Sequence, residues 1–136
     1  MANHAAFVAI LFKKDGELNI KLIRAERSGQ LKLPGGKKQK EETPIETLKR
    51  EVWEEVNLIL KEEEIIKFSS QLRKDHTFFV FTYFLDSDKG DFFRNAKKRE
   101  EEVEDFPISY LKINIENLTF ASAIQKEVIS EIVFSL

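Results

Sequence analysis

Three carboxylates near the middle of the chain have the chemistry and the spacing to bind a divalent cation. Glu51, Glu54 and Glu55 lie within one short segment. An α-helix turns about 100° per residue, so their side chains would share an arc of roughly 100° on one side of a helix. Like charges three or four residues apart destabilise a helix, and a bound cation would compensate that repulsion. The pattern therefore favours a site that offers oxygen ligands to a hard metal ion.

The segment around these carboxylates carries the signals of a helix with a defined start. Thr43 is a suitable N-cap, Pro44 fits the first helical position, and Glu46 completes a capping box. A separate narrow stripe of apolar side chains is formed by Ile45, Leu48, Val52 and Val56. Asn57 follows the last of them, and Asn is the second choice after Gly where a helix closes in the left-handed conformation. We expect a helix that begins at Pro44, packs its apolar stripe and leaves its acidic side for a metal.

The spacing of the polar residues in this region resembles the signature of the Nudix hydrolases. The residues that carry the resemblance are Gly36, Glu42, Arg50, Glu51, Glu54 and Glu55. Asn57 is the one departure, because the family has Gly there. In a chain with 34% charged residues, an acidic helix is ordinarily a solvated surface. A solvated surface requires neither the bend Pro34-Gly35-Gly36 upstream nor an arginine in this register. The likeness is specific over residues 31–60 and rests on element order elsewhere.

The resemblance implies an enzyme that hydrolyses a nucleoside diphosphate linked to another group with Mg²⁺ or Mn²⁺. It assigns metal binding and catalysis to Glu51, Glu54 and Glu55, with the carbonyl of Gly36 as a further metal ligand. Glu42 and Arg50 would orient these carboxylates, because an arginine beside a carboxylate forms a bidentate, charge-assisted pair.

Other residues complete the predicted site. A later acidic residue often joins the metal set or acts as a base in this family, and we expect it at Glu102, with Glu101 and Glu104 as rivals. Arg24 lies near the place where relatives contact the nucleotide. Lys37 follows the glycine bend and could meet phosphates, although loop lysines are equally often solvated.

Some polar residues have an ordinary structural explanation. His4 and His76 are isolated, so a structural role is favoured over catalysis for both. Ser122 is expected to cap a helix. Relatives that hydrolyse oxidised guanine nucleotides read the base with an Asn near that position, so Ser122 weakens this particular assignment.

Length and composition indicate one domain over residues 1–136. The 136 residues and 42% hydrophobic content suffice for an ordinary core. A net charge of −2 gives no indication of nucleic-acid binding, and the absence of cysteine excludes disulfides and thiolate chemistry. The chain shows neither a signal peptide nor an apolar run long enough to cross a bilayer, so we expect a cytoplasmic protein without membrane partners.

The hydrophobic pattern predicts a mixed α/β (α+β) fold, and the resemblance implies the Nudix-type α/β/α sandwich with a mixed β-sheet. Strands are expected at residues 5–12, 18–23, 31–33, 65–70, 77–85 and 108–110, with 77–85 as a central strand of the sheet. Asp15-Gly16 is a hairpin signal between the first two. Residues 97–105 are expected to form an acidic loop. Two helices are expected, the acidic one and a second over residues 121–134.

The leading functional hypothesis is a MutT-like nucleoside triphosphate pyrophosphohydrolase that releases a nucleoside monophosphate and pyrophosphate. A hydrolase of dinucleoside polyphosphates or nucleotide sugars is the first alternative. A nucleotide-binding Nudix domain without turnover is the second, although such domains typically lack one of the motif carboxylates. The sequence does not choose the nucleotide, the general base, the oligomeric state or the biological role.

Overall fold

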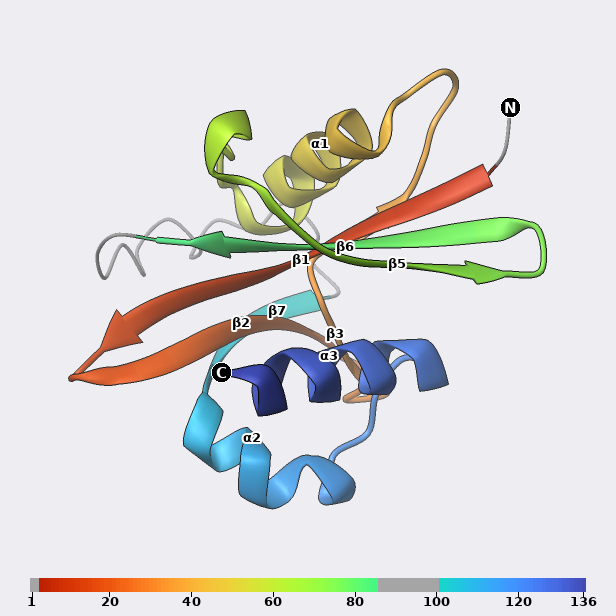
Figure 1. Cartoon of the computed structure of the whole chain (residues 1–136). Helices are drawn as coiled ribbons and strands as arrows, with labels where there is room; N and C mark the ends of the chain where they lie inside the picture. The colour runs from red at the N-terminus through yellow and green to blue at the C-terminus, as the bar shows by residue number, and fades with distance from the viewer. Residues whose placement is uncertain (1–2, 86–100) are drawn as a thin grey trace.

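A mixed β-sheet separates one helix from two others in the computed structural model, which describes residues 3–85 and 101–136. The strands are β1 (Asn3–Lys14), β2 (Glu17–Ala25), β3 (Leu31–Lys32), β4 (Gly35–Lys37), β5 (Ile66–Arg73), β6 (His76–Phe84) and β7 (Glu101–Pro107). The α-helices are α1 (Pro44–Val56), α2 (Ile108–Asn114) and α3 (Ala123–Ser135), with short 3-10 turns at Glu62–Glu64 and Ile115–Asn117. Figure 1 shows α1 on one face of the sheet and α2 and α3 on the other. The expected α/β/α sandwich is therefore confirmed.

Strand β1 is the central strand of the sheet, and both of its faces are covered. The order of strands is β3-β2-β1-β6-β5, with β4 paired to β1 and β7 paired to β2. β1 runs parallel to β6 and antiparallel to β2 and β4. Its side chains alternate between the core under α3 (Ala5, Phe7, Ala9, Leu11) and the core under α1 (Ala6, Val8, Ile10). Burial on both faces explains the nearly unbroken apolar run of this strand.

The strand at 77–85 is confirmed as an internal strand of the sheet, β6, which lies between β1 and β5. Two other expectations about elements were wrong. The acidic run is not a loop from residue 101 onward, because β7 pairs with β2 along its whole length; residues 97–100 lie outside the described residues. Residues 108–110 begin helix α2 instead of forming a strand. Pro107 ends β7, and the buried Ile108 and Leu111 have the spacing of a helix.

The local signals at the helix ends are confirmed, and so is the hairpin turn Asp15-Gly16 between β1 and β2. Thr43 accepts a hydrogen bond from the backbone N–H of Glu46, and the Glu46 side chain accepts one from the N–H of Thr43, so the capping box is complete. Asn57 closes α1 in the left-handed conformation with φ 57°. Ser122 caps α3. Within the described residues, no helix is long and apolar enough to cross a membrane.

The glycine bend places β4 between β1 and α1. Gly36 pairs with Ala6 and Gly35 pairs with Phe7 in the antiparallel ladder. Gly35 has φ 138°, and a Cβ atom there would lie 2.1 Å from the carbonyl oxygen of Ala6. Only glycine fits this backbone conformation and this close approach.

We predict that Gly35→Ala lowers the free energy of unfolding by more than about 3 kcal/mol, because the new methyl group would collide with the β1 backbone. Gly16→Ala is the matched control. Gly16 also has a positive φ, of 77°, but its missing Cβ has open space around it. Gly16→Ala should lower the free energy of unfolding by only about 1 kcal/mol. Urea unfolding curves of both variants measure the difference, and equal losses would contradict the packing argument.

Candidate metal and active site

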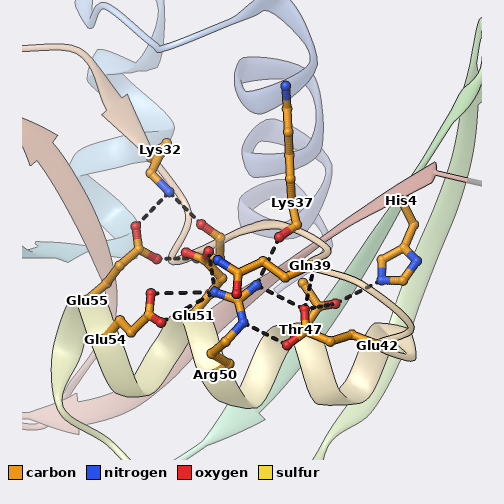
Figure 2. Close-up of polar contacts among 11 residues, drawn as sticks. His4, Lys32, Lys37, Gln39, Glu42, Thr47, Arg50, Glu51, Glu54 and Glu55 are labelled. Atoms are coloured by element: carbon orange, nitrogen blue, oxygen red, sulfur yellow. Dashed lines mark hydrogen bonds and ion pairs between the residues drawn. The ribbon is translucent and has the colours of Figure 1, made fainter.

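The three predicted carboxylates lie along α1 close to Arg50 and Lys32 (Figure 2). Glu51 and Glu55 face the glycine bend. Glu51 and Glu55 are buried, whereas the Glu54 side chain keeps 38% of its exposure. A Cβ atom on Gly36 would lie 2.6 Å from the carboxyl carbon of Glu51. The Glu51 carboxylate therefore occupies the space left by the missing side chain of Gly36, and residues predicted as metal ligands from two elements meet there.

Glu55 is fixed by the glycine bend and by a lysine that the sequence analysis missed. Its Oε1 accepts a hydrogen bond of 2.7 Å from the N–H of Gly35, and its Oε2 lies 3.0 Å from Lys32 Nζ. Lys32 also donates to the carbonyl of Gly35 at 2.8 Å. The Glu55 side chain has no exposed surface, so this ammonium group offsets a buried negative charge. A lysine at the end of a short strand looks like a surface residue, and its sequence position gives no signal of this contact.

Arg50 connects Glu42 to Glu51 and Glu54 on α1. Its Nε and Nη2 donate to the two oxygens of Glu42 at 2.7 and 3.0 Å, which is a bidentate pair. Its Nη1 donates to Glu51 at 2.9 Å and more distantly to Glu54, at 3.4 and 3.5 Å. Nη2 also donates to the carbonyl of Lys37 at 3.0 Å. The structure thus brings Glu42 and Arg50 to the positions that an orienting role requires.

The arginine changes the acidity of its partner. The hydrogen bonds from Arg50 lower the pKa of Glu42 to about 2, helped by the N–H of Gln39 and the hydroxyl of Thr47 and opposed by partial burial. In return, the Glu42 carboxylate raises the pKa of Arg50. Both groups are therefore charged at neutral pH.

A buried histidine and a threonine extend this network to the central strand. The hydroxyl of Thr47 is 3.1 Å from Glu42 Oε1 and 2.9 Å from His4 Nε2. Burial lowers the pKa of His4, and the positive charge of Lys38 acts in the same direction. His4 is isolated in the sequence, and no motif singles out Thr47. No local pattern connects them, because they are 43 residues apart.

The donor set suits a hard divalent cation, since it consists of carboxylate oxygens beside a glycine backbone. Among residues 3–85 and 101–136, no three acidic or histidine side chains converge closely enough to coordinate one ion as they stand. Arg50 and Lys32 provide the positive charge next to these carboxylates. Of the three, Glu54 is the most exposed and has the longest contacts with Arg50, so it is the carboxylate that can most easily turn to another cation.

The remaining predicted residues belong to strands of the sheet and not to α1. Glu102 faces Arg24 across the β2–β7 ladder. The Glu101 side chain is outside the described residues. Glu104, on the same strand as Glu102, accepts a hydrogen bond of 2.5 Å from Arg24 Nε. Arg24 Nη1 donates to the carbonyl of Gly29 at 3.0 Å. Arg24, predicted to contact the nucleotide, is thus held by groups of its own chain.

The side chain of Lys37 points away from α1 (Figure 2). It borders an open cleft of about 370 Å³, whose other lining residues are Arg73, Lys74, Asp75, His76 and Phe78. His76 is hydrogen-bonded to Asp75 at 3.1 Å. Only the backbone carbonyl of Lys37 takes part in the Arg50 network, so a phosphate-binding role for its side chain stays a prediction.

Comparison with known proteins identifies the family. The NUDIX domain family model matches residues 2–131, so the chain belongs to the Nudix family. A comparison with curated proteins gives no match.

Solved structures share the fold at low sequence identity. A MutT structure from work on Aliivibrio salmonicida and Vibrio cholerae has 16% identity, a TM-score of 0.75 and 98% coverage of both chains. The NUDIX domain of Shewanella oneidensis NrtR, complexed with ADP ribose, has 15% identity and a TM-score of 0.66 over 94% of this chain and 86% of that one. A MutT/nudix family protein from Enterococcus faecalis has 18% identity and a TM-score of 0.60 over 79% of this chain, which spans only 44% of that protein.

The lowered pKa of Glu42 predicts a loss of stability in acid. The folded-state pKa of about 2 lies below the ordinary value of 4.5, so the stabilisation is complete above about pH 4.5 and is lost as the pH falls toward 2. Glu42→Gln should remove about 1 to 3 kcal/mol of unfolding free energy at pH 7 and much less near pH 2. Urea unfolding across this pH range measures the effect. Glu41→Gln, at the exposed neighbouring residue, is the control. A loss of unfolding free energy in Glu42→Gln that is as large at pH 2 as at pH 7 would contradict the charge argument.

Proposed function

We propose that this Nudix protein is a Mg²⁺- or Mn²⁺-dependent nucleoside triphosphate pyrophosphohydrolase that releases a nucleoside monophosphate and pyrophosphate. The observation that carries the proposal is the alignment of Glu51, Glu54 and Glu55 along α1, where Glu51 and Glu55 meet the backbone of the glycine bend. The family match and the MutT-like folds support the class of reaction, which is hydrolysis of a phosphoric anhydride.

The roles of the residues follow from their positions. Glu51, Glu54, Glu55 and the carbonyl of Gly36 would hold the metal. When bound, a divalent cation polarises a phosphoryl oxygen and lowers the pKa of a water molecule that attacks phosphorus. Arg50, held by Glu42, donates a hydrogen bond to the Glu51 carboxylate and limits its rotation.

The contacts with substrate are assigned to residues outside α1. Lys37 would bind a phosphate beside the glycine bend, and Arg24 would contact the nucleotide after releasing one of its present acceptors. Glu102 would accept the proton of the attacking water or share the metal charge, provided that its side chain reaches the substrate from β7.

Hydrolysis of a nucleotide sugar or a dinucleoside polyphosphate is the second candidate. It is favoured by the similarity in fold to a NUDIX domain complexed with ADP ribose. A binding domain without turnover ranks below both, because all of the motif carboxylates are present in this chain.

The test is a panel of nucleoside triphosphates, dinucleoside polyphosphates and nucleotide sugars, assayed separately for pyrophosphate and phosphate release. The proposal expects pyrophosphate from a triphosphate with Mg²⁺ or Mn²⁺, and no turnover in excess EDTA. Turnover at full rate in EDTA would overturn the metal-dependent mechanism. Turnover restricted to the other two substrate classes would replace the first candidate with the second.

Glu54→Gln should lower kcat by about a hundredfold or more and leave the fold intact, because it removes a metal-binding charge from a half-exposed side chain. Steady-state kinetics and a thermal melt of the same preparation give the two readings. Glu63→Gln, an exposed change in the 3-10 turn after α1, is the matched control and should be silent. A variant that fails to fold would contradict the assignment of Glu54 to function.

Two neighbouring residues on β7 separate the candidates for the later acidic residue. Glu102→Gln should lower kcat by about tenfold or more if Glu102 meets the metal or the attacking water. Glu104→Gln should leave kcat within about twofold, because Glu104 is already paired with Arg24. If kcat changes little and equally in both variants, the general base is to be sought among the carboxylates of α1.

A further inference from the structure

A chain of hydrogen bonds connects the buried His4 on the central strand to the carboxylates of α1. It runs from His4 through Thr47 and Glu42 to Arg50, with distances of 2.9, 3.1 and 2.7 to 3.0 Å (Figure 2). We propose that His4 and Thr47 are positioning residues, which set the affinity of the metal site through Arg50 without touching the metal. The inference rests on the proposed metal-dependent function and adds two residues to it.

The direction of each hydrogen bond follows from the charge of Glu42. A carboxylate with a pKa of about 2 is ionised at neutral pH and can only accept. The single hydroxyl proton of Thr47 is therefore donated to Glu42, and the oxygen of Thr47 must accept the proton of His4 Nε2. This arrangement favours hydrogen on Nε2 of the histidine, whose ring also has a hydrogen bond with the backbone of Thr43.

His4, at the start of this chain of hydrogen bonds, is held in place by its surroundings. Only 7% of its surface is exposed, and its ring lies edge-on to Phe79 with centroids 5.9 Å apart. Its backbone carbonyl accepts a hydrogen bond of 3.0 Å from the N–H of Lys38. The strand that carries it is the middle of the sheet. Because His4 contacts the Thr47 hydroxyl, the position of this hydroxyl depends on the central strand as well as on α1.

The Glu42 carboxylate receives enough donors to hold Arg50 in one orientation. Its Oε1 accepts from Gln39 N–H, Thr47 Oγ1 and Arg50 Nη2, and its Oε2 accepts from Arg50 Nε. The planar guanidinium group matches the two oxygens, so a rotation of the carboxylate would turn the arginine with it. The Thr47 hydroxyl opposes that rotation.

The orientation of Arg50 determines which carboxylates are available to a metal. Its contacts with Glu42 are short, and its contacts with Glu54 are 3.4 and 3.5 Å. An arginine anchored at Glu42 can release Glu54 to another cation while it keeps Glu51 in place. An arginine that has lost this anchor can follow the α1 carboxylates and compete with the metal for them.

The experiment compares two substitutions of Thr47 that separate the hydroxyl from the shape of the side chain. Thr47→Val keeps the shape and removes the hydroxyl, whereas Thr47→Ser keeps the hydroxyl and removes a buried methyl group. Mn²⁺ alone is titrated into each protein and into the unaltered chain, with free Mn²⁺ measured by electron paramagnetic resonance. A second pair, His4→Phe and His4→Gln, removes or conserves a side-chain N–H donor. Thermal melts of all four variants without metal report stability.

The proposal expects the Mn²⁺ dissociation constant to rise about tenfold in Thr47→Val and in His4→Phe, and to stay within about twofold in Thr47→Ser and His4→Gln. Combining Thr47→Val with His4→Phe should weaken binding little more than either change alone, because both interrupt one chain. These differences should hold even where the melting temperatures of Val and Ser variants are the same.

Three results would overturn the inference. Tight Mn²⁺ binding that is equal in all four variants would leave the proposed function in place and reduce His4 and Thr47 to ordinary packing residues. Mn²⁺ binding that follows the melting temperature, with Thr47→Ser as weak as Thr47→Val, would have the same meaning. Failure of the unaltered chain to bind Mn²⁺ would overturn the metal-dependent function and this inference together.

Discussion

The candidate site depends on the close approach of one glycine backbone to two other elements. Gly35 lies against the carbonyl of Ala6 in the central strand, and Gly36 lies against the carboxylate of Glu51 in α1. Because neither residue has a Cβ atom, the N–H of Gly35 can reach Glu55. The acidic side of α1 is thereby held at a fixed distance from the centre of the sheet. A side chain at either glycine would separate the layers that the site joins.

The second constraint is the accumulation of negative charge on one helix. Three carboxylates on neighbouring turns repel one another, and two of them are buried. Lys32 and Arg50 offset this charge from two directions, one from β3 and one from α1 itself. Buried ion pairs add little to stability once desolvation is counted, so stability alone does not explain this arrangement. The proposed metal binding would explain it, because a metal ion could replace one of these cations beside the carboxylates.

The geometry of β4 separates two kinds of contact. Successive side chains of a strand point to opposite faces, and Lys37 accordingly points away from α1 although its carbonyl meets Arg50. The α1 side gathers the carboxylates, and the other side contains the cleft between Lys37 and the β5–β6 turn. Arg24 lies on β2, where Glu104 holds it. The metal-binding candidates are thus collected at one place, while the substrate-binding candidates are distributed over the sheet.

The sequence alone determined what depends on neighbours along the chain. The helix from Pro44, its capping box, its end at Asn57 and the first hairpin are local, and the acidic spacing revealed both the family and the α1 carboxylates. Tertiary structure decided what depends on distant partners. The acidic run from residue 101 forms strand β7 because it pairs with β2. Lys32 joined the site through Glu55, and His4 joined it through Thr47, 43 residues away in the sequence. No local pattern encodes such contacts, because they exist only after the sheet has brought the segments together.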